Sequence, residues 1–204
     1  MKKFLGLAAA ALCLMSVRPA YAETEQYAFD KLHTQIIFFV SHLGYSHSEG
    51  KFLDFDGGFT FDRTDPSKSS VEVTINTAGL NMDDQKWDDH LKSADFFDVE
   101  KFPTMTFKST NVEVTGDDTA NITGDLTLLG VTKPVTLAVK HNKSGKHPFG
   151  DKYVSGFSAT ATIKRSDFGM KYGLPLLGDD VDIHIEVEGD RVEPTASDAA
   201  SDNK

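Results

Sequence analysis

The chain has 204 residues and a net charge of −10, from 21 basic and 31 acidic side chains. This acidic balance argues against nucleic acid as a partner, which would require a basic stripe, and against adhesion to an anionic membrane surface. It is typical of a soluble, dispersed protein.

The first 22 residues have the features of a secretory signal peptide. Two lysines follow Met1, residues 4–17 form a short apolar run, and Ala20-Tyr21-Ala22 has the form of a cleavage site. The run is shorter than the roughly 20 residues that a bilayer-spanning helix needs. We therefore expect a signal peptide over residues 1–22 and export to the periplasm.

Cleavage after residue 22 would remove the only cysteine, Cys13. Lipid attachment at Cys13 is disfavoured because Leu12 stands where a small residue is needed. The 182 residues that follow would hold no disulfide, and their 18 basic and 31 acidic side chains give a net charge of −13. A chain of this length can bury one self-sufficient core.

Alternation of apolar and polar residues predicts strands along most of the chain. After a short strand over 27–30, a long strand from Thr34 places four residues on one face: Ile36, Phe38, Val40 and His42. A connection rich in Gly, Ser and His follows. An irregular stretch over 52–58, with two glycines that favour a bulge or bend, precedes a second strand that carries Phe59 and Phe61.

Residues 81–98 break this rhythm and predict one short helix. Asp83 and Asp84 suit its first turn, where negative charge meets the positive end of the helix dipole. Trp87 and Leu91 share a helical face, and Phe96 follows. We expect this helix to lie across a barrel mouth, with the three apolar side chains as its plug. Stacking of Trp87 on a ligand is the less favoured alternative.

Further strands are predicted over 70–77, 104–114, 119–129, 135–139, 153–164 and 181–187. Their expected inward residues are Val73, Ile75, Phe107, Leu126, Leu128, Leu137 and Phe157. Residues 141–152 and 166–179 are expected to be loops. Beyond Gly189 the apolar pattern ends, and residues 191–204 are expected to form a disordered acidic tail.

Eight or nine antiparallel strands, one helix and no crossover pattern predict an all-β fold, a closed barrel whose closure removes exposed edges. A barrel of about eight strands is either filled by side chains or just wide enough for one slender ligand. The sequence does not choose between these. Gly124, Ala159 and Ala161 are small inward residues, but they could simply make room for neighbouring phenylalanines.

No motif of known catalytic chemistry is present: there is no phosphate-binding glycine loop, no nucleophile elbow and no zinc-protease motif. The histidines at positions 33, 42, 47 and 90 fall in neighbouring predicted elements, but their spacing gives no tight pair of metal ligands. We therefore predict neither an enzyme nor a metal site.

Two groups of polar residues are each open to two interpretations. His42 is either a cavity group that hydrogen-bonds a ligand head group or a buried histidine satisfied by the backbone, which we favour. Lys164 and Arg165 could hold an anionic head group, although a plain surface ion pair is favoured. The remaining histidines are expected at the surface: His141, His147 and His184.

Several ordered segments resemble the YceI-like family of lipocalin-like periplasmic proteins. The opening stretch carries His33-Thr34, Phe38, Val40, His42-Leu43-Gly44, Gly50-x-Phe52, Phe55-Asp56-Gly57 and Phe61-Asp62. Later segments are His90-Leu91, Ser93 to Asp98, Phe102-Pro103, Phe107, Thr123 to Thr127, Gly130 to Val135 and Arg165 to Gly169. The resemblance covers nearly all of the chain after the leader and ends before the acidic tail.

The resemblance implies a lipocalin-like antiparallel β-barrel over residues 23–190 that holds a long isoprenoid or similar amphiphile, such as a polyprenyl chain or a ubiquinone tail. Beyond such a lipid, no cofactor is expected. The expected ligand-binding residues are Ile36, Phe38, Val40, His42, Phe52, Phe59, Phe61, Val73, Ile75, Leu91, Phe96, Phe107, Leu126, Leu128, Leu137 and Phe157.

Three functions stay open. The first is a periplasmic carrier, a monomer or homodimer, that sequesters or ferries the lipid. The second is an accessory protein that presents a quinone to a membrane-bound cytochrome or lipid enzyme. The third is a ligand-free, stress-related barrel whose interior is filled and whose activity lies on its surface.

Overall fold

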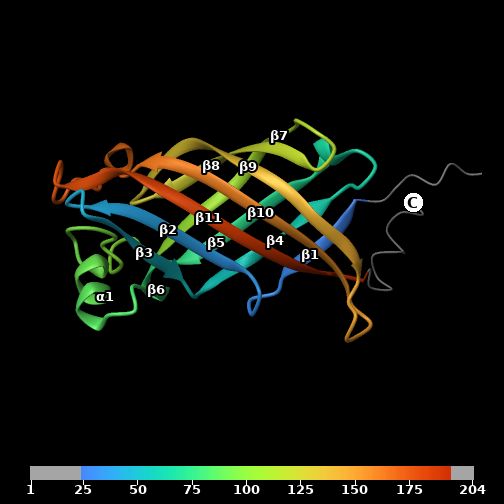
Figure 1. Ribbon diagram of the computed structural model, residues 1–204, viewed down its shortest axis with the longest axis horizontal. Coiled ribbons are helices and arrows are strands. Elements are labelled where there is room, and N and C mark those ends of the chain that lie inside the picture. Colours follow the sequence, from blue (N-terminus) through green and yellow to red (C-terminus); the bar gives the residue numbers. More distant parts are fainter. Residues whose placement is uncertain (1–23, 194–204) are drawn as a thin grey trace, which may run out of the picture.

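The structure, a computed structural model, describes residues 24–193. The predicted signal peptide lies outside these residues, as does the predicted tail beyond residue 193. The described chain forms one α-helix, α1 (Gln85–Lys92), and eleven strands (Figure 1). The strands are β1 (Glu25–Phe29), β2 (Gln35–His42), β3 (Ser46–Phe52), β4 (Phe55–Phe61), β5 (Ser70–Asn76), β6 (Leu80–Asn81), β7 (Thr104–Val114), β8 (Thr119–Leu128), β9 (Val131–Lys146), β10 (Tyr153–Lys164) and β11 (Leu177–Arg191).

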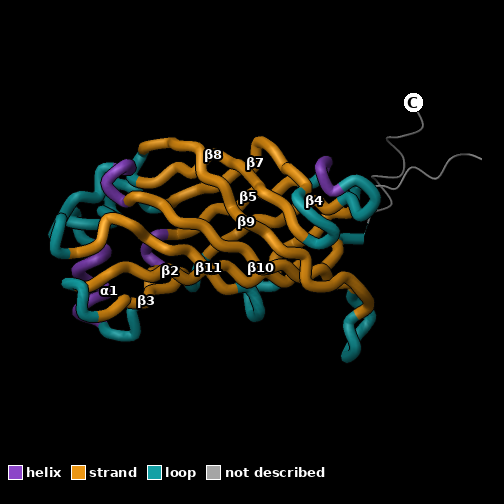
Figure 2. The backbone as a smooth tube through the Cα atoms, turned by 45° about the horizontal axis from the view of Figure 1, so that its top comes forward, coloured by secondary structure: helices purple, strands orange, loops and turns teal. Residues whose placement is uncertain are grey.

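Eight of the strands close into an antiparallel barrel. They pair in the order β1-β4-β5-β7-β8-β9-β10-β11, and β11 returns to β1 with Tyr27 opposite Arg191. The tube that results is longer than it is wide (Figure 2). The predicted all-β, closed barrel of eight strands is confirmed.

The other three strands prolong this ring at one end. β2 follows β1 and pairs with the first part of β11, β3 pairs with β2, and β6 pairs with the end of β3. The breaks between β1 and β2, β3 and β4, and β5 and β6 therefore divide three long barrel strands. This division explains why eleven strands form an eight-stranded barrel.

The Gly-, Ser- and His-rich connection after β2 is more ordered than predicted. Its turn spans only Leu43 to Tyr45, and the polar residues after it form β3. Leu43 and Gly44 both have positive φ, as tight hairpin turns between twisted strands require. Gly50 serves packing instead, because a Cβ there would lie 2.2 Å from Cζ of Phe38.

Helix α1 begins at an Asp84 cap, whose carboxylate accepts hydrogen bonds from the N–H groups of Lys86 and Trp87. The helix turns the buried Asp88 inward, where its carboxylate accepts a 2.6 Å bond from the Met82 N–H. Trp87 is rotated about 100° from that direction and is 44% exposed, so it is not the predicted plug. The other two predicted plug residues do pack inward: Phe96 is buried, together with Phe97, and Leu91 is partly buried against the apolar cluster.

No helix within residues 24–193 is long and apolar enough to cross a membrane.

The two ends of the barrel differ. Helix α1 covers one end, whereas the described chain begins and ends at the other (Figure 1). The buried apolar cluster centres on the α1 end, where Phe97 contacts Phe52 and Phe38 at ring distances of 5.5 and 6.4 Å. Further along the tube, inward residues such as Val73 and Leu137 are only partly buried. The interior is therefore packed near α1 and looser beyond it.

Candidate ligand cavity

A cavity of about 630 Å³ lies inside the barrel and is lined almost entirely by apolar side chains. This volume falls within the range of small-molecule sites. The structure thus answers the question that the sequence left open, because the barrel is hollow. Gly124 does not provide the space, since a Cβ there would meet the Phe107 ring at 2.4 Å. Ala159 lies on the cavity wall, whereas Ala161 does not.

All sixteen residues predicted to contact a ligand lie on the wall of this cavity. Fourteen of them lie on strands of the barrel or its extensions, where alternation turns every second side chain inward. Leu91 belongs to α1, Phe96 follows it, and His42 ends β2. Their contact with a bound molecule stays a prediction.

Aromatic rings form the wall at both ends of the cavity. Near α1, Phe38 and Phe52 lie 5.7 Å apart. At the opposite end, Phe157 contacts Phe59 and Phe61 edge-on at 5.3 and 5.2 Å. Edge-on pairs are a favourable arrangement for aromatic rings and hold the wall in a defined shape.

His42 lies half-buried on the cavity wall, with its ring 6.1 Å from that of Trp87. It is not the fully buried histidine that we favoured from the sequence. Because β2 ends at this residue, the imidazole lies at the rim next to α1. The interpretation of His42 as a polar group of the cavity fits this position better.

His141 was predicted at the surface, and the structure corrects this. β9 continues to Lys146 and so includes the first six residues of the predicted loop, and His141 faces the cavity. Its ring lies 5.3 Å from Phe61 and 5.1 Å from Phe157, and burial lowers the pKa of its imidazole. The signal was available, because His141 continues the inward alternation of Val135, Leu137 and Val139.

A polar chain runs from His141 into the barrel wall. Its Nε2 lies 2.8 Å from the Ser144 hydroxyl, which lies 2.7 Å from that of the fully buried Ser155. Close by, the buried Tyr27 donates to Glu25, and burial, reinforced by Glu25, raises the pKa of Tyr27 to about 12. These bonds satisfy the polar groups buried at the end of the barrel opposite α1.

Lys164 and Arg165 were both predicted to lie at the surface in ion pairs, and this prediction is wrong for Arg165. Lys164 is exposed and pairs with Asp180 at 2.7 Å. Arg165 is only 3% exposed and lies on the cavity wall. Lys164 ends β10 and faces outward, so the next residue turns inward at the start of a 3₁₀ helix over Arg165–Phe168.

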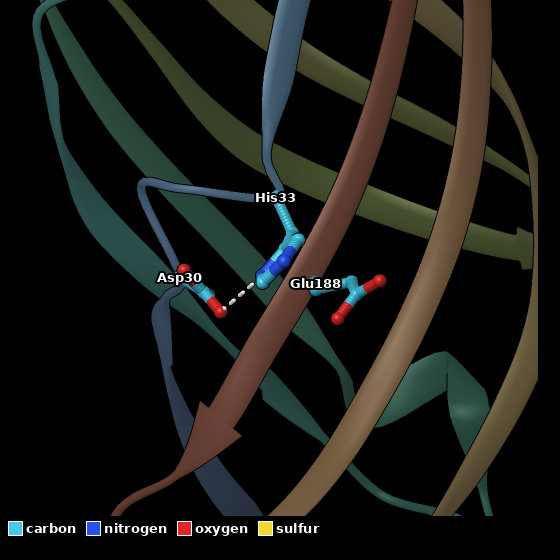
Figure 3. Close-up of side chains that lie close together, drawn as sticks. All are labelled: Asp30, His33 and Glu188. Atoms are coloured by element: carbon cyan, nitrogen blue, oxygen red, sulfur yellow. Dashed lines mark hydrogen bonds and ion pairs between the residues drawn. The ribbon is translucent and has the colours of Figure 1, made fainter.

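Asp30, His33 and Glu188 bring three potential ligand atoms within 4.8 Å of one another outside the cavity (Figure 3). Asp30 accepts bonds from the Leu32 N–H at 2.9 Å and from His33 Nδ1 at 2.8 Å. The bond with Asp30 raises the pKa of His33 and lowers that of Asp30. These contacts fix the turn between β1 and β2, where the ring closes onto β11.

Comparison with known proteins gives a consistent result. The YceI-like domain matches residues 27–189. A UPF0312 protein of Pseudomonas aeruginosa (strain LESB58) is 46% identical over 187 residues, which cover 91% of this chain and 97% of that protein.

Solved structures also match. A crystal structure of the Campylobacter jejuni YCEI protein is 34% identical with a TM-score of 0.66, covering 75% of this chain and 90% of that one. A polyisoprenoid binding domain from Saccharophagus degradans, implicated in plant cell wall breakdown, has a TM-score of 0.65 at 12% identity, covering 82% and 99%. At that identity the likeness concerns the fold alone. With the family match over most of the barrel, the chain belongs to the YceI-like family.

Proposed function

We propose that this protein binds one amphiphilic lipid, with its apolar tail inside the barrel, and carries it through an aqueous compartment. The observation that supports this most strongly is the hollow interior, a cavity of about 630 Å³ whose wall is almost wholly apolar. An empty apolar cavity costs packing energy, and an apolar chain that fills it would recover that energy.

The expected affinity comes from the tail. Each buried methylene contributes about 0.8 kcal/mol, so an isoprene unit of five carbons contributes up to ~4 kcal/mol. Association itself costs ~4–15 kcal/mol in lost freedom of motion. A tail of one or two units would therefore bind weakly, and affinity should rise with length until the cavity is full.

An isoprenoid is our preferred cargo. The family resemblance and the polyisoprenoid-binding neighbour support it, and the wall of alternating phenylalanine and branched aliphatic residues suits a methyl-branched chain. The predominantly apolar wall supports a binding role rather than catalysis. Export to the periplasm, proposed from the leader, would place the carrier between two membranes.

The direct test is calorimetric titration of lipid-stripped protein with geranylgeraniol, an isoprenoid alcohol. We expect saturable binding of one molecule and a negative heat-capacity change, the mark of apolar burial. Absence of saturable binding for this alcohol and for its longer homologues would overturn the proposal. If the natural cargo is a quinone presented to a membrane partner, the extracted ligand will show a quinone absorbance band that a polyprenol lacks.

A further inference from the structure

Arg165 is a buried charge on the wall of an apolar cavity. Its side chain is 3% exposed, and its guanidinium donates hydrogen bonds only to backbone carbonyls. Nε donates to Gly178 at 2.7 Å, Nη2 to Leu177 at 3.2 Å and Nη1 to Met170 at 3.2 Å. A guanidinium carries five N–H groups, so three bonds leave two of them without an acceptor.

The positive charge also lacks a direct counter-ion. Among residues 24–193, no carboxylate forms an ion pair with Arg165. Asp179, the acidic group that acts on it electrostatically, accepts bonds from the Ser166 N–H at 2.9 Å and hydroxyl at 2.8 Å. Burial lowers the pKa of Arg165 and Asp179 raises it, but arginine remains charged in proteins at neutral pH. Burying a charge without a partner is costly.

The three carbonyl bonds have a structural role, because they join the start of the 3₁₀ helix to the loop that leads into β11. That role accounts for the donors that are used. It does not require a full charge, nor does it account for the two N–H groups of this cavity-lining residue that have no acceptor. A phosphate or carboxylate would satisfy such an arginine best, because its oxygens accept charge-assisted hydrogen bonds from the guanidinium.

The position of Arg165 also defines an end of the cavity. Leu177, whose carbonyl it binds, pairs with His42, and His42 lies beside Trp87 of α1. Phe157 lies toward the other end of β10, eight positions before Arg165. A ligand head at Arg165 would therefore lie near α1, and its tail would extend toward Phe157 and His141.

We propose that Arg165 binds an anionic head group, phosphate or carboxylate, of the lipid that the barrel carries, with the head next to α1. This inference rests on the proposed function and specifies its cargo as an acidic amphiphile. The net charge of the chain opposes it at long range, so the preference must come from this one local contact.

The experiment compares two probes that share a tail, geranylgeranyl phosphate and geranylgeraniol, binding to lipid-stripped protein. We expect the wild-type protein to bind the phosphate at least tenfold more tightly, as bonds between charged groups allow. In R165M, which retains most of the side-chain length without its charge, the preference should vanish while binding of the alcohol persists. K164M is the matched control, since Lys164 is adjacent and exposed, and the preference should survive there.

Each other outcome rejects a different part of the inference. Equal affinities in the wild type would overturn the acidic head group and leave the lipid carrier intact. A preference that persists in R165M would overturn the assignment to Arg165. Failure of both probes and of their longer homologues to bind would overturn the proposed function itself.

A second variant covers the case in which R165M does not fold. R165K retains the charge but cannot make the three-way carbonyl contact of a guanidinium. If Arg165 binds an anion, R165K retains a preference for the phosphate even when the protein is less stable. If Arg165 has only a structural role, R165K will be less stable, and neither the wild type nor R165K will prefer the phosphate over the alcohol.

Discussion

Filling the cavity should abolish lipid binding without unfolding the barrel, and Ala159→Phe is the substitution that tests this. Ala159 lies on the cavity wall in the middle of β10 and is 8% exposed. Its neighbour Thr160 faces outward and is exposed, so Thr160→Phe adds the same side chain outside the barrel.

The magnitude follows from the space that the ring occupies. A phenyl ring would displace about four to six tail carbons, which removes ~3–5 kcal/mol of binding free energy at ~0.8 kcal/mol per buried group. Affinity should therefore fall by a factor of ~10²–10⁴. Overpacking a filled core costs ~1–3 kcal/mol, whereas burying a phenylalanine in open space gains ~1.5–3 kcal/mol.

Two measurements check this, namely calorimetric titration with geranylgeraniol and urea unfolding of the lipid-free proteins. We expect Ala159→Phe to lose binding while its free energy of unfolding stays equal to or above that of the wild type. Thr160→Phe should bind normally. Unchanged affinity of Ala159→Phe would show that the lipid does not lie in the barrel. A destabilisation of ~1–3 kcal/mol or more would show that the interior is packed and not hollow.

Three further outcomes are expected. Phe38→Asp places a carboxylate on the cavity wall and should abolish retention of a labelled lipid in a pull-down. Phe39→Asp, on the outer face against His184, should retain the lipid, and equal retention by both variants would refute the assigned register. His141 has a pKa lowered by burial, so its contribution to stability is full above about pH 6.5 and is lost as the pH falls through the lowered value. The free energy of unfolding of His141→Gln, measured with denaturant, should therefore fall less than that of the wild type between pH 7 and pH 5. An identical fall in both proteins would contradict the buried position of His141. Gly57 has a φ of 132°, and a Cβ there would lie 2.2 Å from the Glu72 carbonyl, so Gly57→Ala should lower the thermal midpoint, while Gly145→Ala, with open space around it, should not.

Period-two alternation was sufficient to predict the inward faces. The stripes of β2, β5, β8 and β10 are long and regular, and a one-residue register error would have turned every member outward. The same rule would have found His141, but the glycines and proline after it indicated a loop. β9 extends into that region because it pairs with the start of β10, with Lys146 opposite Tyr153 and His141 opposite Phe157.

The burial of Arg165 was not predicted from the sequence. Alternation in β10 points residue 165 inward after the outward Lys164, but a charged residue at the end of a strand indicates the surface, and the 3₁₀ helix that follows buries it. The carbonyls that bind Arg165 come from the loop before β11, whose path local sequence does not determine. The mouth helix was predicted from its acidic cap and apolar spacing, but the exposure of Trp87 depends on which side of an eight-residue helix meets the barrel.

Native mass spectrometry of the protein purified from its own cells would reveal one lipid inside the barrel. We expect a one-to-one mass adduct that organic solvent releases as an apolar-tailed lipid and that Ala159→Phe lacks. A wild-type protein that carries no adduct and takes up no added isoprenoid would refute lipid binding inside the barrel.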